Sequence, residues 1–191
     1  MSSHSSPAFA NVQHVFLDRD GVINRKLPEG EYVSAWHHFH LLPGAEEAIA
    51  ALNRSGRVVI VITNQRGVAL GRYTEADVRA VHDELQSHLN RSGAHVDAFY
   101  FCPHDKNECN CRKPKTGLFE QALRDFPEAS EKNSIVIGDS LSDIEAARNF
   151  GAPSIFIEGD PQFQKAGAEK ARALADASSG SLSEALTRFL R

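Results

Sequence analysis

Two acidic residues one position apart are the first chemically informative feature of this chain. Asp18 and Asp20 stand in the segment Asp-Arg-Asp-Gly21, directly after the apolar run 14–17. A strand that delivers two carboxylates into a glycine turn suits phosphoryl transfer, because the first can attack phosphorus and the second can carry the proton. Ordinary turns also favour Asp and Gly, so the pair predicts this chemistry only together with residues further along the chain.

Two later residues supply what a phosphoryl-transfer site needs besides a nucleophile. Thr63 follows the apolar run 58–62, and its hydroxyl, with nearby backbone N–H groups, could hold a phosphoryl oxygen. Lys113 could provide the positive charge that neutralises the phosphoryl group and Asp18. Taken singly, Thr63 also suits a helix cap and Lys113 a surface position, so the prediction depends on their order behind Asp18.

A third later feature is Gly-Asp139-Ser-Leu-Ser-Asp143, which follows the apolar run 135–137. Asp139 could complete an oxygen-rich site for catalytic Mg2+ with the Asp18 carboxylate and the Asp20 main-chain carbonyl. For Asp143 two alternatives stay open: a residue that binds through water or fixes the loop, and an ordinary helix N-cap. The whole set predicts a Mg2+-dependent phosphatase site with Asp18 as nucleophile and Asp20 as acid and base.

The three cysteines of the chain all fall within ten positions. An odd number so close together is a poor disulfide framework, so metal binding is the better interpretation. With one histidine they make a tetrahedral set for a closed, structural Zn2+ site: Cys102, His104, Cys109 and Cys111. The alternative is buried cysteines beside an unrelated histidine. We expect the zinc loop to stiffen the segment that carries Arg112 and Lys113.

Five apolar, β-branched or aromatic runs indicate strands, at residues 14–17, 58–62, 96–101, 135–137 and 154–157. Segments with helical spacing lie at 45–53, 75–91, 116–125 and 142–149, and a last helix follows Ser181. This alternation favours an α/β fold with a parallel sheet covered by helices on both faces. The polar residues above follow the strands, at the edge where open α/β sheets bind ligands.

Length and composition limit the class of protein. The chain has 191 residues, 41% hydrophobic and 24% charged, which suits one globular domain. We expect residues 13–191 to form that domain behind a disordered tail, residues 1–12. The net charge of −4 gives no reason to expect a nucleic-acid partner, and no apolar run is long enough to cross a membrane. We therefore expect a cytoplasmic, monomeric protein that acts on a small molecule.

The ordered set of Asp18, Asp20, Thr63, Lys113 and Asp139 resembles the haloacid-dehalogenase-like phosphatase superfamily. The resemblance covers residues 14–157. It implies a Rossmann-like parallel sheet in the order 3-2-1-4-5, with the Asp18 strand in the centre and an aspartyl-phosphate intermediate. The short intervals from Asp18 to Thr63 and from Thr63 to Lys113 leave no room for a large cap domain, so loops must select the substrate.

The zinc loop narrows this resemblance. Cys-Pro-His104 and Cys-x-Cys-Arg-Lys-Pro114 are similar to the D-glycero-D-manno-heptose 1,7-bisphosphate 7-phosphatase family and to the related histidinol-phosphatase domain. Three segments favour the heptose family: Gly30-Glu-Tyr-Val33, Leu42-Pro-Gly44 and the stretch 63–75. The resemblance implies substrate contacts by Arg19, Glu29, Gly30, Glu31, Tyr32, Asn64, Gln65, Arg66 and Arg112. Arg112 suits a second, non-reacting phosphate because its planar fork binds oxygens in pairs.

Four other functions are weighed against this one. A histidinol-phosphate phosphatase and a broad-specificity sugar phosphatase would use the same catalytic residues. A polynucleotide 3′-phosphatase shares the core, but the chain lacks a basic stripe. A catalytically inactive scaffold that binds partners through its zinc loop conflicts with the complete set of catalytic residues. The sequence departs from the heptose family at Val22, Arg66, Leu70 and Ser140, which bears on the identity of the substrate.

Overall fold

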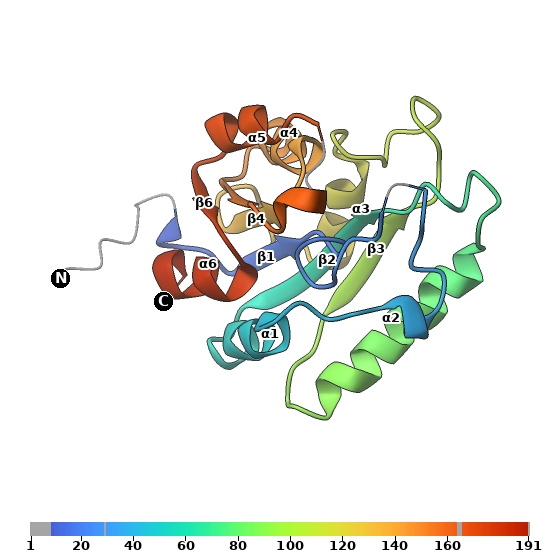
Figure 1. Ribbon diagram of the computed structural model, residues 1–191. Coiled ribbons are helices and arrows are strands. Elements are labelled where there is room, and N and C mark those ends of the chain that lie inside the picture. Colours follow the sequence, from blue (N-terminus) through green and yellow to red (C-terminus); the bar gives the residue numbers. More distant parts are fainter. Residues whose placement is uncertain (1–8, 29, 164–165, 191) are drawn as a thin grey trace.

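The computed structural model describes residues 9–28, 30–163 and 166–190. Within them, six parallel strands form one sheet in the order β3-β2-β1-β4-β5-β6 (Figure 1). The strands are β1 (His14–Leu17), β2 (Val58–Asn64), β3 (Ala98–Cys102), β4 (Ser134–Gly138), β5 (Ser154–Ile157) and β6 (Ala177–Ser179). The expected order 3-2-1-4-5 is confirmed, with β1 between β2 and β4 at the centre.

The sixth strand is a correction to the predicted sheet. β6 consists of Ala-Ser-Ser, which has none of the β-branched or aromatic residues that indicate a strand. Pairing with its neighbour holds it instead, because the backbone N–H of Glu158 at the end of β5 donates to Ser179 O at 2.9 Å. The Asp176 carboxylate also accepts a bond from the Ser154 backbone N–H at 2.8 Å. Tertiary contacts therefore decide the structure of this segment.

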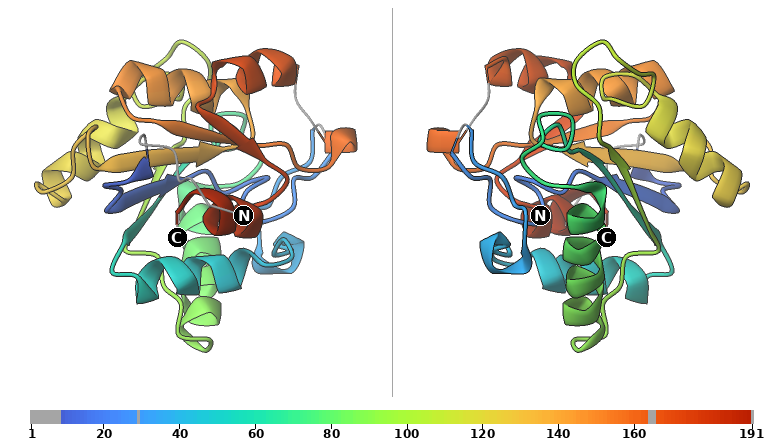
Figure 2. Two further views of the ribbon diagram at one scale, coloured as in Figure 1. Left: turned by 90° about the vertical axis from the view of Figure 1, so that its left-hand side faces the viewer. Right: turned by 90° about the vertical axis from the view of Figure 1, so that its right-hand side faces the viewer.

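Helices cover both faces of the sheet (Figure 2). One face carries α1 (Ala45–Arg54), α2 (Glu75–Asn90) and α6 (Leu182–Phe189), and the other carries α3 (Gly117–Asp125), α4 (Leu141–Phe150) and α5 (Ala168–Leu174). Two short 3-10 turns, η2 (Trp36–His38) and η3 (Pro161–Phe163), lie in the connections. The four predicted internal helices agree with α1 to α4 within two residues at each end.

Alternation along β1 shows why both faces are apolar. Val15 and Leu17 belong to the core under α1, α2 and α6, whereas Phe16 belongs to the core under α3 and α4. Phe16 packs edge-on against Phe119 of α3, with ring centroids 5.1 Å apart. Successive strand residues point to opposite faces, so a strand buried on both sides must be apolar at every position.

A capping box forms the start of helix α2. Thr74 is its N-cap, and the Thr74 hydroxyl accepts from the Asp77 backbone N–H at 3.2 Å. The Asp77 carboxylate in turn accepts from the Thr74 backbone N–H at 2.8 Å, which completes a capping box. This cap ends the loop after β2 and places it beside the rim of the sheet.

No cap domain interrupts the described residues. Between β1 and β2 the chain forms only η2 and α1, and between β2 and β3 it forms only α2. In Figure 1 the loops that follow β1, β2 and β3 gather on the right of the sheet. These loops therefore surround the end of the sheet at which the strands finish.

The predicted tail needs one correction at its C-terminal end. Residues 1–8 lie outside the described residues, but Phe9 and Val12 are 2% and 7% exposed and join the main core. The Phe9 ring lies 5.5 Å from that of Phe189 in α6, so residues 9–12 are part of the folded domain. None of the helices in the described part of the chain is long and apolar enough to span a membrane.

Candidate active site

Strand β1 delivers Asp18 to the rim of the sheet. The Asp18 backbone N–H still donates to Ile137 O of β4 at 2.9 Å, so Asp18 continues the strand by one residue. Gly21 then turns the chain with φ +98°, a conformation that glycine adopts without strain. A Cβ at Gly21 would overlap the Asp139 carboxylate. The glycine of the motif therefore allows the loop after β1 to contact the acid after β4.

Lys113 forms the positive centre of the site. Its Nζ lies 2.9 Å from Asp18 Oδ1, 2.6 Å from Asp143 Oδ1 and 2.7 Å from Ile62 O. The side chain is only 2% exposed. Burial opposes the charge of Lys113, but Asp143 and Asp18 outweigh it and raise the pKa of the amine above its usual range. The expected pairing of Lys113 with the nucleophile is present.

Asp18 is mostly buried, with 8% of its surface exposed. Burial raises the pKa of its carboxyl, and Lys113 opposes that rise. Asp143 uses both carboxylate oxygens to fix the loop after β4. Its Oδ2 accepts from the Ser140 backbone N–H at 3.0 Å, and its Oδ1 pairs with Lys113. The N-cap of α4 is Ser140 and not Asp143, which is the N3 residue of the capping box; contact of Asp143 with Mg2+ stays a prediction.

The carboxylates at the ends of β1 and β4 make a set that fits a hard cation. One carboxylate oxygen each from Asp18, Asp139 and Asp143 lies within 4.8 Å of the others, and all three residues are buried. Asp139 Oδ1 accepts no hydrogen bond from any residue that the structure describes. Carboxylate oxygens with an unused buried acceptor are suitable Mg2+ ligands. Asp18 and Asp139 thus fit the expected Mg2+ site.

The other oxygen of Asp139 has a cation of its own. Lys26 Nζ forms an ion pair with Asp139 Oδ2, and the two side chains are 9% and 7% exposed. Burial raises the pKa of Asp139 to about 7, although Lys26 acts in the opposite direction. Lys26 had no signal in the sequence, because a single lysine in the loop after β1 looks like an exposed residue until the fold brings it to β4.

The Asp20 carboxylate is held by three donors. Arg19 Nη2 donates to its two oxygens at 2.9 and 3.0 Å, Asn24 Nδ2 to Oδ1 at 2.9 Å and Gln65 Nε2 to Oδ2 at 3.0 Å. Burial works against the charge, but Arg19 and the other donors prevail and lower the pKa of Asp20. The site holds Asp20 as an oriented carboxylate.

Two predicted substrate ligands, Arg19 and Gln65, are used inside this network. Arg19 is 1% exposed, and its other terminal nitrogen lies 3.4 Å from His82 Nε2. Gln65 is 3% exposed and also donates to Thr63 Oγ1 at 2.9 Å. The structure places both side chains behind Asp20, and their contact with substrate stays a prediction.

Asn64 connects the end of β2 to the segment after the zinc loop. Its Oδ1 accepts from the Lys113 backbone N–H at 3.0 Å, and its Nδ2 donates to Lys113 O at 3.1 Å. Thr63, next to it, is 1% exposed and lies at the rim as expected. The reciprocal pair fixes the backbone of the catalytic lysine to the sheet.

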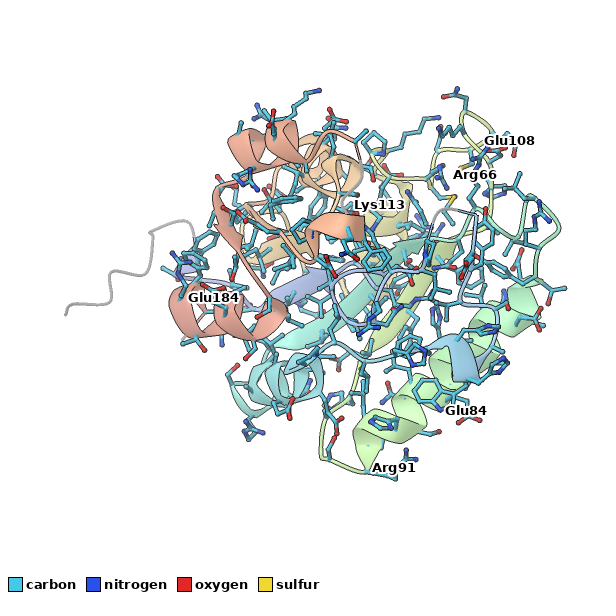
Figure 3. All side chains as sticks on the ribbon, viewed as in Figure 1. Arg66, Glu84, Arg91, Glu108, Lys113 and Glu184 are labelled. Atoms are coloured by element: carbon cyan, nitrogen blue, oxygen red, sulfur yellow. The ribbon has the colours of Figure 1, made fainter. Side chains whose placement is uncertain are left out.

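The remaining predicted substrate residues lie on the loops around the rim. Arg66 forms a two-point ion pair with Asp105, at 2.5 Å from Nε and 3.1 Å from Nη2. Arg112 reaches His104 O with Nη1 at 3.4 Å. Gly30 and Glu31 are exposed, Tyr32 is half-buried, and Glu29 lies outside the described residues. Figure 3 shows Lys113 nearer the middle of the molecule and Arg66 close to Glu108 of the zinc loop.

The four residues of the expected zinc site converge. Cys102 Sγ and Cys109 Sγ are 3.5 Å apart, Cys109 Sγ and Cys111 Sγ are 3.3 Å apart, and His104 Nδ1 lies 3.3 Å from Cys111 Sγ. No disulfide forms among the three cysteines. Four ligands about 2.3 Å from a common centre stand roughly 3.8 Å apart in a tetrahedron, so the cluster fits a closed zinc site.

Comparison with known proteins agrees with this geometry. A family model described as HAD-hydrolase-like matches residues 110–183. The D-glycero-alpha-D-manno-heptose-1,7-bisphosphate 7-phosphatase of Mycobacterium bovis is 45% identical over 139 residues, which cover 72% of this chain and 73% of the relative. The D-glycero-beta-D-manno-heptose-1,7-bisphosphate 7-phosphatase of Rhodopseudomonas palustris is 41% identical over 153 residues, 76% of this chain and 83% of the relative.

A solved structure resembles the whole domain. It is the D,D-heptose 1,7-bisphosphate phosphatase from B. bronchiseptica complexed with magnesium and phosphate, with a TM-score of 0.80 and 29% identity. The match covers 94% of this chain and 98% of that one. The motifs, the sheet order and the relatives agree, and the chain belongs to the heptose 1,7-bisphosphate 7-phosphatase family, a group of phosphatases in the HAD-like hydrolase superfamily.

Proposed function

We propose that this chain removes the 7-phosphate of D-glycero-D-manno-heptose 1,7-bisphosphate with Mg2+ as cofactor. One observation carries the proposal: the Asp18 carboxylate pairs with Lys113 and lies within 4.8 Å of a carboxylate oxygen of Asp139, while Asp20, two residues on, is held by a separate set of donors. Relatives named for this reaction support the choice of substrate. We extend the proposal to a monomer that acts in the cytoplasm on a small molecule.

The reaction has two steps. Asp18 attacks phosphorus, so that a bond from its carboxylate oxygen to phosphorus forms while the bond from phosphorus to the sugar oxygen breaks. Asp20 gives its proton to the leaving oxygen, then takes one from the water that hydrolyses the aspartyl-phosphate. Lys113 keeps Asp18 ionised and offsets charge on the transferred group. When bound, Mg2+ would add positive charge beside the phosphoryl oxygens, held by Asp18, Asp139 and the Asp20 main chain.

The charge of the Asp20 carboxyl can change when substrate binds, as its role as a proton donor requires. Its donors lower the pKa of the free carboxyl, so Asp20 is ionised before substrate binds. A phosphate dianion close to Asp20 raises that pKa again, because like charges disfavour ionisation. The bound substrate therefore favours protonation of Asp20, and this proton is the one that the leaving group requires.

The second phosphate is assigned to the side of the zinc loop. Arg66 and Arg112 both lie there, and they are joined through Asp105 and the His104 carbonyl. Guanidinium groups bind phosphate oxygens in pairs, which suits recognition without reaction. We infer that the closed zinc site keeps this loop rigid, with Cys102, His104, Cys109 and Cys111 as ligands.

The test is phosphate release with Mg2+ from both anomers of the heptose bisphosphate and from histidinol phosphate. A preference of about 100-fold in kcat/KM for one heptose anomer, equal to about 2.7 kcal/mol, supports the proposal. A preference for histidinol phosphate would replace the substrate and keep the mechanism. Equal, slow turnover of all three would leave a broad-specificity phosphatase.

The variant Asp18→Asn tests the mechanism separately. It keeps the size of the side chain but removes the attacking carboxylate, so phosphate release should fall by about 10⁴-fold or more for every substrate. Circular dichroism should show an unchanged fold. Appreciable turnover by the folded variant would exclude Asp18 as the nucleophile.

A further inference from the structure

Tyr73 is a buried residue that the proposed mechanism does not use. It lies at the end of the loop after β2, one position before the N-cap of α2, and is 7% exposed. Its hydroxyl donates to Gln65 Oε1 at 2.7 Å. Burial raises the pKa of Tyr73 to about 12, so the phenol keeps its proton.

The hydrogen bond to Tyr73 decides how the Gln65 amide faces. A glutamine amide has one acceptor oxygen and two N–H donors on its nitrogen. Tyr73 engages the oxygen, which turns the nitrogen towards Asp20 Oδ2 at 3.0 Å and Thr63 Oγ1 at 2.9 Å. The amide is buried, so without the tyrosine its oxygen would have to find another donor or turn.

The loop is shaped to bring the tyrosine into this place. A Cβ at Gly67 would overlap the Tyr73 ring, so only glycine there admits it. The Tyr73 ring also lies beside Tyr32 of the loop after β1, with ring centroids 5.6 Å apart. Tyr73 therefore lies between a predicted substrate loop and the side chain that holds Asp20.

We propose that Tyr73 is a positioning residue, whose hydroxyl orients Gln65 so that the Asp20 carboxyl is aimed at the leaving oxygen. The inference rests on the acid role of Asp20 in the proposed function. In this proposal Tyr73 acts through Gln65 on Asp20, so its effect must appear where proton donation to the leaving group matters. A ring that only filled space would have no such selectivity.

The test is the variant Tyr73→Phe, assayed on two substrates that differ in leaving group. A sugar phosphate has an alkoxide leaving group and needs the proton, whereas p-nitrophenyl phosphate releases a stable phenolate and does not. We expect kcat/KM for the sugar phosphate to fall about tenfold and that for p-nitrophenyl phosphate to stay within about twofold. kcat/KM reports the first irreversible step, so it excludes the later hydrolysis of the aspartyl-phosphate.

Tyr100→Phe is the matched control. It also removes one hydroxyl, whose bond to Asp125 Oδ2 is 2.6 Å long, but on β3 away from the network. The ratio of the two kcat/KM values should equal that of the wild type. If Tyr73→Phe lowers kcat/KM equally for both substrates, or for neither substrate, the positioning role is wrong.

Two more variants separate this inference from the proposed function. Asp20→Asn should show the same selectivity with a larger loss, and if it shows none, the acid role of Asp20 fails and the inference fails with it. If Asp20→Asn is selective and Tyr73→Phe is not, only the inference fails. In a Gln65→Leu background, Tyr73→Phe should add no further loss, because the two act through one contact.

Discussion

The carboxylates at the ends of β1 and β4 share the rim of the sheet with the sulfur atoms of the zinc loop, but the two clusters are stabilised differently. Asp18 and Asp139 each have a lysine of the chain as counter-ion, Lys113 and Lys26. In the cysteine cluster the sulfur atoms lie against one another instead, with Cys109 Sγ 3.5 Å from Cys102 Sγ and 3.3 Å from Cys111 Sγ. A site with its own cations can exchange its metal, whereas converging thiolates need a metal to stay together.

The largest expected effect breaks the zinc cluster. Cys109→Ser removes the sulfur that contacts both Cys102 and Cys111, so the chain should lose its zinc, about one ion per wild-type chain. The melting temperature should fall by about 10 °C, as expected for a loss of roughly 3 kcal/mol. Metal analysis and a thermal melt measure both.

Lys106→Ala is the control in the same loop, because Lys106 is exposed and its side chain is not a ligand. It should keep zinc and melting temperature unchanged. If Cys109→Ser kept the zinc content and melting temperature of this control, the cysteine cluster would not be a structural metal site. The contrast between the carboxylate and cysteine clusters would then be lost.

The next largest effect concerns His82, a buried residue near the carboxylates, and is measured as the pH dependence of the free energy of unfolding. His82 is 4% exposed and stacks on Phe99. Burial and the nearby Arg19 lower the pKa of His82 to about 3, while the unfolded chain takes up this proton near pH 6.5. Stability is therefore complete above pH 6.5 and falls by about 1.4 kcal/mol per unit below it.

The variant His82→Leu should remove this pH dependence of stability. Between pH 6.5 and 5, the free energy of unfolding should fall about 2 kcal/mol less in the variant than in the wild type, as measured by urea denaturation. Replacing the exposed His40 by Leu should leave the wild-type profile. Parallel profiles for wild type and His82→Leu would show that the imidazole is protonated in the folded protein.

The smallest effect tests the counter-ion at Asp139. Lys26→Gln removes the charge that competes with a bound cation, so Mg2+ should bind about threefold more tightly, or about 0.7 kcal/mol. Isothermal titration at pH 9 measures the affinity with Asp139 ionised. Weaker binding in the variant would mean that Lys26 supports the metal site and does not compete with it.

The strands and helices near the site were predictable because both faces of the sheet are covered. Each central strand is then a continuous apolar run, and Asp18, Thr63 and Asp139 each follow such a run. These three lie at the rim as that reasoning predicts, whereas Lys113 lies in the loop after β3 and only the fold brings it to Asp18. β6 was not predictable, because Ala-Ser-Ser carries no strand signal and pairing with β5 decides its structure.

Contacts between loops were the part that the sequence could not supply. Arg19 and Gln65 were expected at the substrate, but the direction of each side chain depends on a distant partner. Arg19 contacts His82, 63 positions away, and Gln65 contacts Asp20, 45 positions away. Lys26 and Tyr73 have no characteristic spacing, so only the folded rim reveals them. Local pattern predicts which element a residue is on, and packing decides what its side chain touches.

The paired amide contacts between Asn64 and the Lys113 backbone have a consequence for how this family can vary. They join the Lys113 backbone to β2, and Ile62 O of the same strand accepts a hydrogen bond from the Lys113 amine. The position of the lysine is therefore independent of how many residues lie between His104 and Cys109. Insertions there would lengthen the loop proposed to meet the substrate without moving the charge that the proposed reaction needs, so specificity can evolve while the chemistry stays in place.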